Sequence, residues 1–516
     1  MRFRLALPIA IAVLCAGAGT SLGAESEQPT LADERPNVVV IVTDDQDTAL
    51  FSRHLMPNTF ALFRDGGTRL TNFTITTPLC CPSRATQLTG QYGHNNGVLA
   101  NDPGYPALRD PTNMLPAWLR ADGYRTAQVG RYLNGYKRAG SPLTPAPGWD
   151  RWVGLLDLNY RDYDLSLDGR KRTFTGMGGR SYVTRNLHRR ANGIVRDLAA
   201  EDEPFYLQID DLAPHSDHLA RGPCTRSALP GPEKLRPVRD LHLPRNPAEE
   251  RSVADKPSFI RRLPPIGPSA FEAVLHRMRC RAASIREVDR GIGRLVRTLR
   301  RTGELGSTAI VFYSDNGYFN GEHRVTKSKG LAYEESIQVP FAIRLPGGIL
   351  PARPARKLDF PAANIDIVPT ILALTGSDPC TAEGECRRLD GRPLLPGLAD
   401  PGSWPAGRAL LLEIDQRRSL AGGTLACTYT GVRQGSQVYV EYERVARARS
   451  RECHDTHEAE HYRLRSDPHE RRNLWPADND PDRLAQDRLR VTMRRLSGCA
   501  GNANGLGPAP SATPCE

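Results

Sequence analysis

Beyond its N-terminal segment, the sequence lacks any apolar run that approaches the roughly 20 residues needed to cross a membrane. It also lacks clustered basic residues, because the Lys and Arg side chains behind its formal net charge of +11 are scattered along the chain. No basic helix or aromatic RNA-binding motif accompanies them, so nucleic acid is not expected as a partner, although the charge favours other anions. There are no internal repeats. The composition, 39% hydrophobic and 25% charged, is that of an ordinary globular protein.

The N-terminus is the exception to this polar character. Two arginines precede an apolar run over residues 5–18, and small residues follow up to Ala24. This pattern is typical of a secretory signal peptide, so we expect residues 1–24 to be removed and the protein to act outside the cytoplasm. Cys15 raises the alternative of a lipoprotein, but a leucine precedes it where lipid-attachment sites usually have a small residue.

Export would place the remaining cysteines in an oxidising compartment, where structural disulfides form. Eight of them make four pairs of sequence neighbours: Cys224 with Cys280, Cys380 with Cys386, Cys427 with Cys453, and Cys499 with Cys515. This pairing is a hypothesis, since connectivity does not follow from sequence. It leaves only the adjacent Cys80 and Cys81.

Short apolar segments alternate with helical patterns along most of the chain. The first, Asn37–Thr43, is a continuous β-branched run and predicts a strand buried on both faces, as in a parallel sheet. Further strands are expected at 68–76, 124–129, 205–209, 308–313 and 341–345, and helices at 57–64, from about 83 towards 90, and at 272–300. This alternation predicts an α/β fold in which helices sandwich a large, mostly parallel central sheet.

The pattern changes after residue 400. Alternating segments at 409–413, 429–433 and 438–442, with a helix at 481–496, predict a small antiparallel C-terminal subdomain. A Pro- and Arg-rich stretch, 221–268, is expected to be irregular. The predicted organisation is a signal peptide (1–24), a catalytic domain (25–400), the C-terminal subdomain (401–500) and a tail (501–516).

Two acidic pairs follow predicted strands directly. Asp44 and Asp45 come after the first strand, and Asp315 and Asn316 after the strand at 308–313. Ligands of open α/β sheets bind at the carboxyl ends of the strands. Three carboxylates and an amide oxygen would suit a hard cation such as Ca²⁺ or Mg²⁺. Either pair alone could equally be a helix cap or a turn.

Between these pairs lies Cys80-Cys81-Pro82-Ser83-Arg84, which continues to Leu88-Thr89-Gly90. The stretch resembles the C-x-P-S-R-x-x-x-L-T-G signature of the sulfatase family at every defined position. In that family a formylglycine-generating enzyme oxidises the cysteine to formylglycine, whose hydrated aldehyde attacks sulfur and displaces the alcohol. Only Cys80 has Pro two residues on and Arg four residues on, so the resemblance implies that Cys80 is converted.

The resemblance also implies the roles of other residues. The metal, Ca²⁺ in preference to Mg²⁺, is expected to be held by these ligands: Asp44, Asp45, Asp315, Asn316 and the modified Cys80. Arg84 would bind the sulfate group. His215 and Lys329 match the positions that serve the leaving oxygen, and histidine suits proton transfer near neutral pH.

One departure from the family concerns the base. Many sulfatases have G-K-x-H where this chain reads Gly130-Arg131-Tyr132-Leu133-Asn134. Arg131 can replace the cation, with a different reach, but Leu133 cannot accept a proton. His323 is our candidate for the missing base, with a structural role as the alternative. The same stretch resembles the G-K-Y-L-N of sulfatases that act on N-acetylglucosamine 6-sulfate groups, which implies a sulfated carbohydrate or an aryl sulfate as substrate.

Three other functions remain open at this point. Phosphodiesterases and phosphonate monoester hydrolases of the alkaline phosphatase superfamily share the metal ligands. The run from His457 through Glu458 to His461 matches the H-E-x-x-H motif of zinc metalloproteases, but its surroundings are charged and form no apolar stripe, so a solvated loop or strand is expected instead. An exported glycan-binding protein with an inactive site is disfavoured, because every expected metal ligand is present.

Overall fold

The computed structural model of the protein describes residues 35–138, 143–176, 178–217, 224–225, 227–231, 235–243, 252–416, 425–447, 452–502 and 513–515. The predicted signal peptide lies outside these residues. Within the described ranges, no helix combines the length and the apolar character that a membrane crossing requires.

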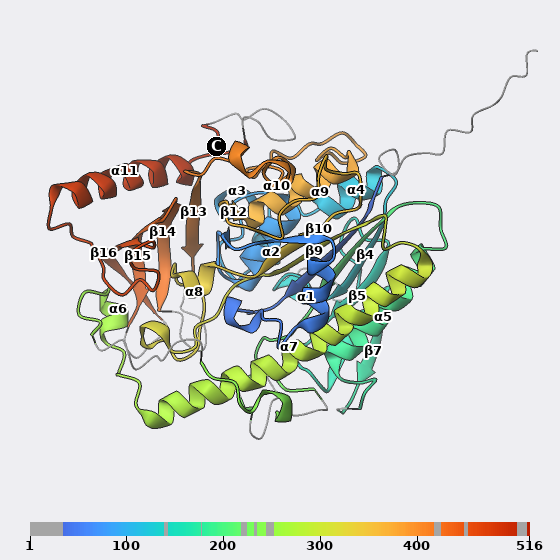
Figure 1. Ribbon diagram of the computed structural model, residues 1–516, viewed down its shortest axis with the longest axis horizontal. Helices are drawn as coiled ribbons and strands as arrows, with labels where there is room; N and C mark the ends of the chain where they lie inside the picture. The colour runs from blue at the N-terminus through green and yellow to red at the C-terminus, as the bar shows by residue number, and fades with distance from the viewer. Residues whose placement is uncertain are drawn as a thin grey trace, which may run out of the picture.

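A ten-stranded sheet forms the centre of the molecule (Figure 1). In spatial order its strands are β11 (Lys357–Leu358), β2 (Gly67–Leu70), β10 (Phe341–Arg344), β9 (Thr308–Ser314), β1 (Asn37–Thr43), β8 (Phe205–Asp210), β4 (Arg125–Gly130), β5 (Arg151–Leu155), β6 (Tyr163–Leu167) and β7 (Arg170–Phe174). The middle of the sheet, from β9 to β5, is parallel. Strands β10, β6 and β7 run antiparallel to their neighbours. The predicted α/β fold is confirmed, with a parallel centre and mixed edges.

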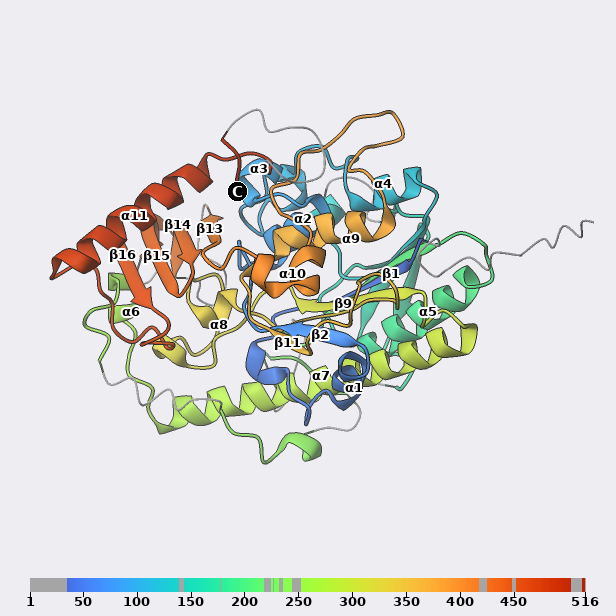
Figure 2. The ribbon, with the colours of Figure 1, turned by 45° about the horizontal axis from the view of Figure 1, so that its top comes forward.

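Helices cover both faces of this sheet (Figures 1 and 2). One face carries α1 (Pro57–Arg64), α5 (Val183–Leu198) and α7 (Pro268–Thr302); the other carries α2 (Cys80–Thr89), α4 (Leu115–Ala121), α9 (Ile367–Thr375) and α10 (Leu395–Ala399). Every residue of β1 and β9 is buried between the two layers. This explains why these strands read as continuous apolar runs rather than as alternating ones.

The C-terminal part forms the expected small antiparallel sheet. Its strands are β13 (Ala409–Asp415), β14 (Ala426–Gln434), β15 (Gln437–Ala446) and β16 (Cys453–Arg463), and α11 (Asp480–Ser497) packs against them. Arg433 of β14 makes a bidentate ion pair, 2.7 and 3.0 Å, with Glu334 of the larger part. The domain boundary at residue 400 stays a prediction.

Two segments differ from the prediction. The expected strand at 68–76 is broken into β2 and the short β3 (Phe73–Thr74), which pairs with β12 (Ala362–Ala363) outside the main sheet. The helix expected from about residue 83 begins earlier, at Cys80. Pro82 therefore lies in its first turn, where the backbone N–H groups have no helical partner and proline is tolerated. This shift puts Cys80 at the very start of α2.

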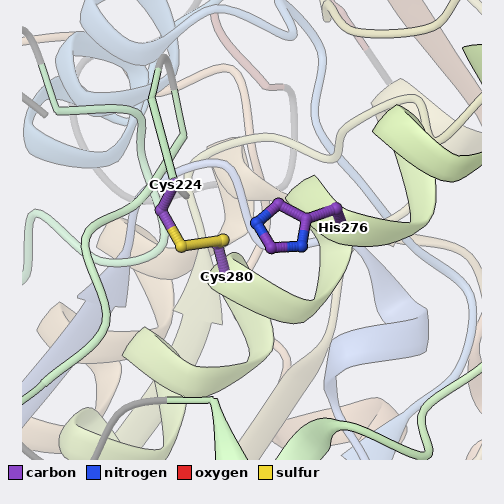
Figure 3. A group of neighbouring side chains, drawn as sticks. All are labelled: Cys224, His276 and Cys280. Carbon is purple, nitrogen blue, oxygen red and sulfur yellow. A yellow bond between two sulfur atoms is a disulfide. The ribbon is translucent and has the colours of Figure 1, made fainter. Parts of the chain in front are cut away.

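All four expected disulfides are present, and Cys80 and Cys81 are free. The bond between Cys499 and Cys515 ties the end of the predicted tail to the segment after α11. His276 lies beside the Cys224–Cys280 bond, one turn before Cys280 on α7 (Figure 3). Because the two sulfurs are bonded to each other, neither is a thiolate, so this group is no metal site.

Candidate active site

The two acidic pairs meet at one edge of the sheet. Strands β1 and β9 are parallel and in register, with Thr43 opposite Ser314, so the residues that follow them emerge side by side. The backbone N–H of Asp45 donates a hydrogen bond of 3.1 Å to the Asp315 carboxylate. Asp44, Asp45, Asp315 and Asn316 are all buried. The spacing of the strands thus gathers three carboxylates at the carboxyl ends.

Cys80 lies against these carboxylates. Its sulfur is 3.4 Å from Asp44 Oδ1 and 4.0 Å from Asp45 Oδ1, and the side chain is fully buried. Burial raises the pKa of the Cys80 thiol far above its ordinary value. The Cys81 sulfur points elsewhere, 3.6 Å from the carbonyl of Asn134. Of the two adjacent cysteines, only Cys80 faces the acidic cluster.

The residues at this edge fit a divalent metal ion. Ligand atoms of Asp44, Asp45, Cys80 and Asp315 lie within 4.8 Å of one another. The Asn316 amide donates to Asp45 Oδ1 at 2.8 Å, while its own oxygen is buried without a hydrogen-bond partner. Burial and the neighbouring Asp44 raise the pKa of Asp315 to about 7. An unpartnered amide oxygen beside crowded carboxylates is the ligand set that hard cations such as Ca²⁺ prefer.

Among the described residues, three buried cations pair with the carboxylates of the cluster. Arg84 binds Asp315 at 2.8 Å, Asp210 at 2.9 Å and Asp44 at 3.3 Å. The Arg131 guanidinium contacts Asp44 and donates to Asn134 Oδ1 at 2.9 Å. The concentration of positive charge would favour an anionic substrate at this edge.

The third cation, Lys329, is the nearest one to the sulfur. Its ammonium group lies 2.7 Å from the Cys80 sulfur and also contacts the Asp45 carboxylate. Burial alone would lower the pKa of Lys329, but Asp45 and Cys80 raise it above its ordinary value. The side chain therefore stays charged at neutral pH.

His215 completes the group from the loop after β8. Its Nε2 is 3.9 Å from Asp45 Oδ2, and a ring nitrogen lies within 4.8 Å of the Cys80 sulfur. Its Nδ1 is 2.8 Å from the carbonyl of Ser216. Burial lowers the pKa of His215 to about 4, although Asp44 and Asp45 act in the opposite direction. The imidazole is thus neutral near pH 7.

His323 lies in a different group. Its ring stacks on Tyr333, with centroids 4.0 Å apart, and its Nε2 is 3.4 Å from Glu335. A ring nitrogen also lies within 4.8 Å of the carboxylate of Glu470, which lies between β16 and α11. The role of His323 as the base stays a prediction that these contacts do not favour.

Sequence reasoning missed Asp210. It ends β8, which lies next to β1, and it anchors Arg84 while accepting hydrogen bonds from Gln128 at 2.8 Å and Gln208 at 2.9 Å. The signal was present, because Asp210 follows an apolar strand as Asp44 does. What the sequence does not reveal is that β8 is a neighbour of β1.

The zinc-protease motif is contradicted by its location. His457, Glu458 and His461 lie on β16, which is an extended strand and not a helix. Residues four apart on a strand are separated by roughly 13 Å, too far to share one zinc ion. The Glu458 carboxylate instead accepts from Ser258, and His461 contacts Gln437. The metalloprotease hypothesis is therefore wrong.

Comparisons with known proteins agree with this geometry. The family model described as Sulfatase matches residues 36–377. The chain is 32% identical over 416 residues to an N-acetylglucosamine-6-sulfatase of Homo sapiens, covering 78% of this chain and 71% of that protein. It is 32% identical over 424 residues to an arylsulfatase of Chlamydomonas reinhardtii, which covers 77% of this chain but only 62% of the algal protein's length.

Solved structures share the fold. The structure of BT4656 in complex with its substrate D-glucosamine-2-N,6-O-disulfate superposes with a TM-score of 0.66 at 23% identity. The match covers 89% of this chain and 97% of that one. The family model spans most of the described residues, and the signature cysteine lies at the acidic edge of the sheet. The chain therefore belongs to the sulfatase family.

Proposed function

We propose that this protein is an exported enzyme that hydrolyses sulfate esters of sulfated sugars, with residue 80 acting as formylglycine beside a divalent metal ion. The observation that carries the proposal is the position of Cys80. Its sulfur faces Asp44 and Asp45 and lies 2.7 Å from the Lys329 ammonium. The sulfatase family uses a formylglycine and a divalent metal, and Cys80 stands where that aldehyde would meet both the metal ligands and the cations.

Different side chains would bind the metal, supply the nucleophile and bind the sulfate group. Asp44, Asp45, Asp315 and Asn316 would hold Ca²⁺, which when bound supplies Lewis acidity and offsets the crowded negative charge. Converted residue 80 supplies a hydrated aldehyde as the nucleophile. Arg84 and Arg131 orient the sulfate group and stabilise the charge that builds on its oxygens.

Two further residues would stabilise the leaving group and accept a proton. Lys329 remains cationic and stabilises negative charge on the leaving oxygen. His215 is neutral and close to residue 80, so we infer that it accepts the hydroxyl proton, the role that sequence reasoning gave to His323. This assignment needs no group at Leu133.

A pocket beside Arg131 supports a sugar as the group that carries the sulfate. The pocket has a volume of about 360 Å³, and Tyr132, Tyr136 and Trp152 line it together with Asn101 and Asn134. Aromatic walls suit the apolar face of a sugar ring, and amide groups suit its hydroxyls. The four disulfides support export, because such bonds persist in oxidising compartments.

The test compares two neighbouring cysteines. We expect Cys80→Ala to abolish release of sulfate from an aryl sulfate, and Cys81→Ala to leave turnover within about threefold, because the Cys80 sulfur contacts Asp44 and Lys329 whereas the Cys81 sulfur contacts the Asn134 carbonyl. Mass spectrometry of the peptide that contains residue 80 should show the mass loss of conversion from thiol to aldehyde. Full activity of Cys80→Ala would reject the proposal.

The same assay addresses the other chemistry of the superfamily. Wild-type protein is offered an aryl sulfate, a phosphate diester and a phosphonate monoester in parallel. Faster turnover of either phosphorus substrate than of the sulfate would favour the phosphodiesterase or phosphonate hydrolase alternative.

A further inference from the structure

A groove rich in arginine runs between α5 and α7, away from the catalytic residues. The two helices lie side by side on one face of the sheet (Figures 1 and 2). The groove has a volume of about 560 Å³. Arg180, Arg185, Arg189 and Arg196 line it from the α5 side. Arg294, Arg297 and Arg301 line it from the α7 side.

The packing of the two helices explains how the groove forms. They run parallel, since Arg185 pairs with Glu287 and, further along both, Thr298 donates to Asn192 at 2.6 Å. His188 packs directly over Gly291, where a Cβ would lie 2.3 Å from the imidazole ring. This close approach leaves the long arginine side chains on the outer rims. On α7, positions 294, 297 and 301 share one helical face over roughly 10 Å.

The positive charge of the groove is poorly neutralised by the protein. Among the described residues that line it, none is acidic, and only Arg185 has a carboxylate partner, Glu287 at 2.7 Å. Arg189 donates instead to the neutral Asn186 side chain. Burial lowers the pKa of Arg294, Glu287 raises it, and the like charges of Arg185 and Arg297 lower it again. Among the described residues, seven lining arginines have Glu287 as their nearby carboxylate, so positive charge is in excess and attracts anions.

The start of α5, which lies at one end of the groove, is connected to the catalytic edge through a short chain of contacts. Tyr182, at the start of α5, packs on Tyr160, with ring centroids 5.7 Å apart. The Tyr160 hydroxyl donates at 2.9 Å to the carbonyl of His215. The end of the groove near Arg180 and Arg185 therefore lies on the active-site side of the helical layer.

We propose that the α5–α7 groove is a second binding site, which holds a sulfated polysaccharide chain remote from the bond that is cleaved. This inference rests on the proposed function, because that function makes sulfated sugars the anions that the protein meets, and a chain of them would present several sulfate groups to the row of arginines. Guanidinium groups bind sulfate oxygens in a bidentate manner. None of the described lining residues is aromatic, so the groove has no platform on which nucleic-acid bases would stack.

The test uses two variants of the full chain that remove the same number of charges. The groove variant is Arg294→Gln with Arg297→Gln and Arg301→Gln. The control variant changes three exposed helical arginines outside the groove: Arg300→Gln, Arg488→Gln and Arg494→Gln. Binding to dextran sulfate and to unmodified dextran is measured at several salt concentrations, together with turnover of a small aryl sulfate.

We expect the groove variant to bind dextran sulfate roughly tenfold more weakly than wild type, with a smaller salt dependence, and the control variant to bind within about twofold. Turnover of the aryl sulfate should be unchanged in both variants. Equal loss of binding in the two variants would overturn the groove as a site.

Two further outcomes are informative. If a DNA oligonucleotide of similar charge binds more tightly than dextran sulfate, and loses that binding in the groove variant, the polysaccharide assignment is wrong. If wild type does not turn over the aryl sulfate but the groove variant still loses dextran sulfate binding, the proposed function fails while the anion site stands.

Discussion

Asn316 illustrates how much one side chain reveals about this site. Its amide nitrogen donates to Asp45 and to the carbonyl of Gly317, both at 2.8 Å, whereas its buried oxygen has no hydrogen-bond partner. A buried polar atom without a partner costs roughly 1–3 kcal/mol. A cation bound between Asn316 and the three carboxylates would remove this cost.

The first prediction follows from that oxygen. We expect Ca²⁺ to raise the melting temperature of the wild-type protein, since a ligand that binds only the folded state stabilises it, by about 2.7 kcal/mol at 100 times its dissociation constant. Asn316→Ala should weaken Ca²⁺ binding roughly tenfold or more and shrink the shift. Scanning calorimetry with and without a chelator measures both.

Asn96→Ala is the control for this prediction. Asn96 is also buried, but its amide nitrogen donates to the carbonyl of Gln91, outside the site. This variant should have a lower melting temperature but an unchanged response to Ca²⁺. An equal response to Ca²⁺ in Asn316→Ala would argue against Asn316 as a ligand.

At the scale of elements, the end of β4 must approach β8 unusually closely. Gly130 has a φ of 120°, in the region that favours glycine, and a Cβ there would lie 1.9 Å from the carbonyl oxygen of Asp210. The next backbone N–H, that of Arg131, donates to the same carbonyl at 2.9 Å. Gly130 thereby positions both Arg131 and the partner of Arg84.

We therefore predict that Gly130→Ala destabilises the protein by roughly 3 kcal/mol or more, from strain and overlap together, and reduces sulfatase turnover. Gly376→Ala separates the two effects, because Gly376 also has a positive φ, 66°, but nothing lies near its missing Cβ. It should cost only about 1 kcal/mol. Urea denaturation measures the loss of free energy of unfolding in each variant. Equal losses would mean that the close approach of Gly130 to Asp210 is absent.

The elements also show what sequence could and could not predict. The strands at β1, β8 and β9 could be predicted because burial on both faces leaves a continuous apolar run. Strands β5 to β7 could not, since β7 is mostly exposed and its pairing with β6 depends on the rest of the fold. For the same reason the neighbours of β1, and with them the part played by Asp210, required the structure.

At the scale of the whole molecule, His94 of α3 (Gly93–Asn96) joins distant parts of the chain. Its Nδ1 lies 3.0 Å from the Glu413 carboxylate of β13, and its Nε2 lies 3.0 Å from the carbonyl of Cys499, beyond α11. Both partners are acceptors, so both ring nitrogens must carry protons. Burial opposes that charge, but Glu413 outweighs it and raises the pKa of His94 to about 9.

This contact predicts a dependence of stability on pH. A histidine whose pKa is raised by folding stabilises the protein fully below its unfolded pKa of about 6.5, and that contribution is lost as the pH rises through 9. We expect a loss on the order of 2 kcal/mol in the free energy of unfolding between pH 6 and pH 9.5. Urea denaturation across this range measures it.

His94→Gln is the comparison for this pH series. Glutamine retains hydrogen bonding but does not titrate, so the difference in stability between wild type and variant should be largest at pH 6 and vanish near pH 9.5. A difference that is constant with pH would mean that His94 is neutral in the folded protein.

The burial of Cys80 also bears on whether residue 80 could be modified before or after the chain folds. Its side chain is wholly inaccessible at the start of α2, beneath a shell of cations and carboxylates. If residue 80 is converted as we propose, a maturation enzyme would have to reach the sulfur before folding, while the segment is still extended. Under that proposal, a cell that exported the protein faster than it converted residue 80 would accumulate a well-folded but inactive product.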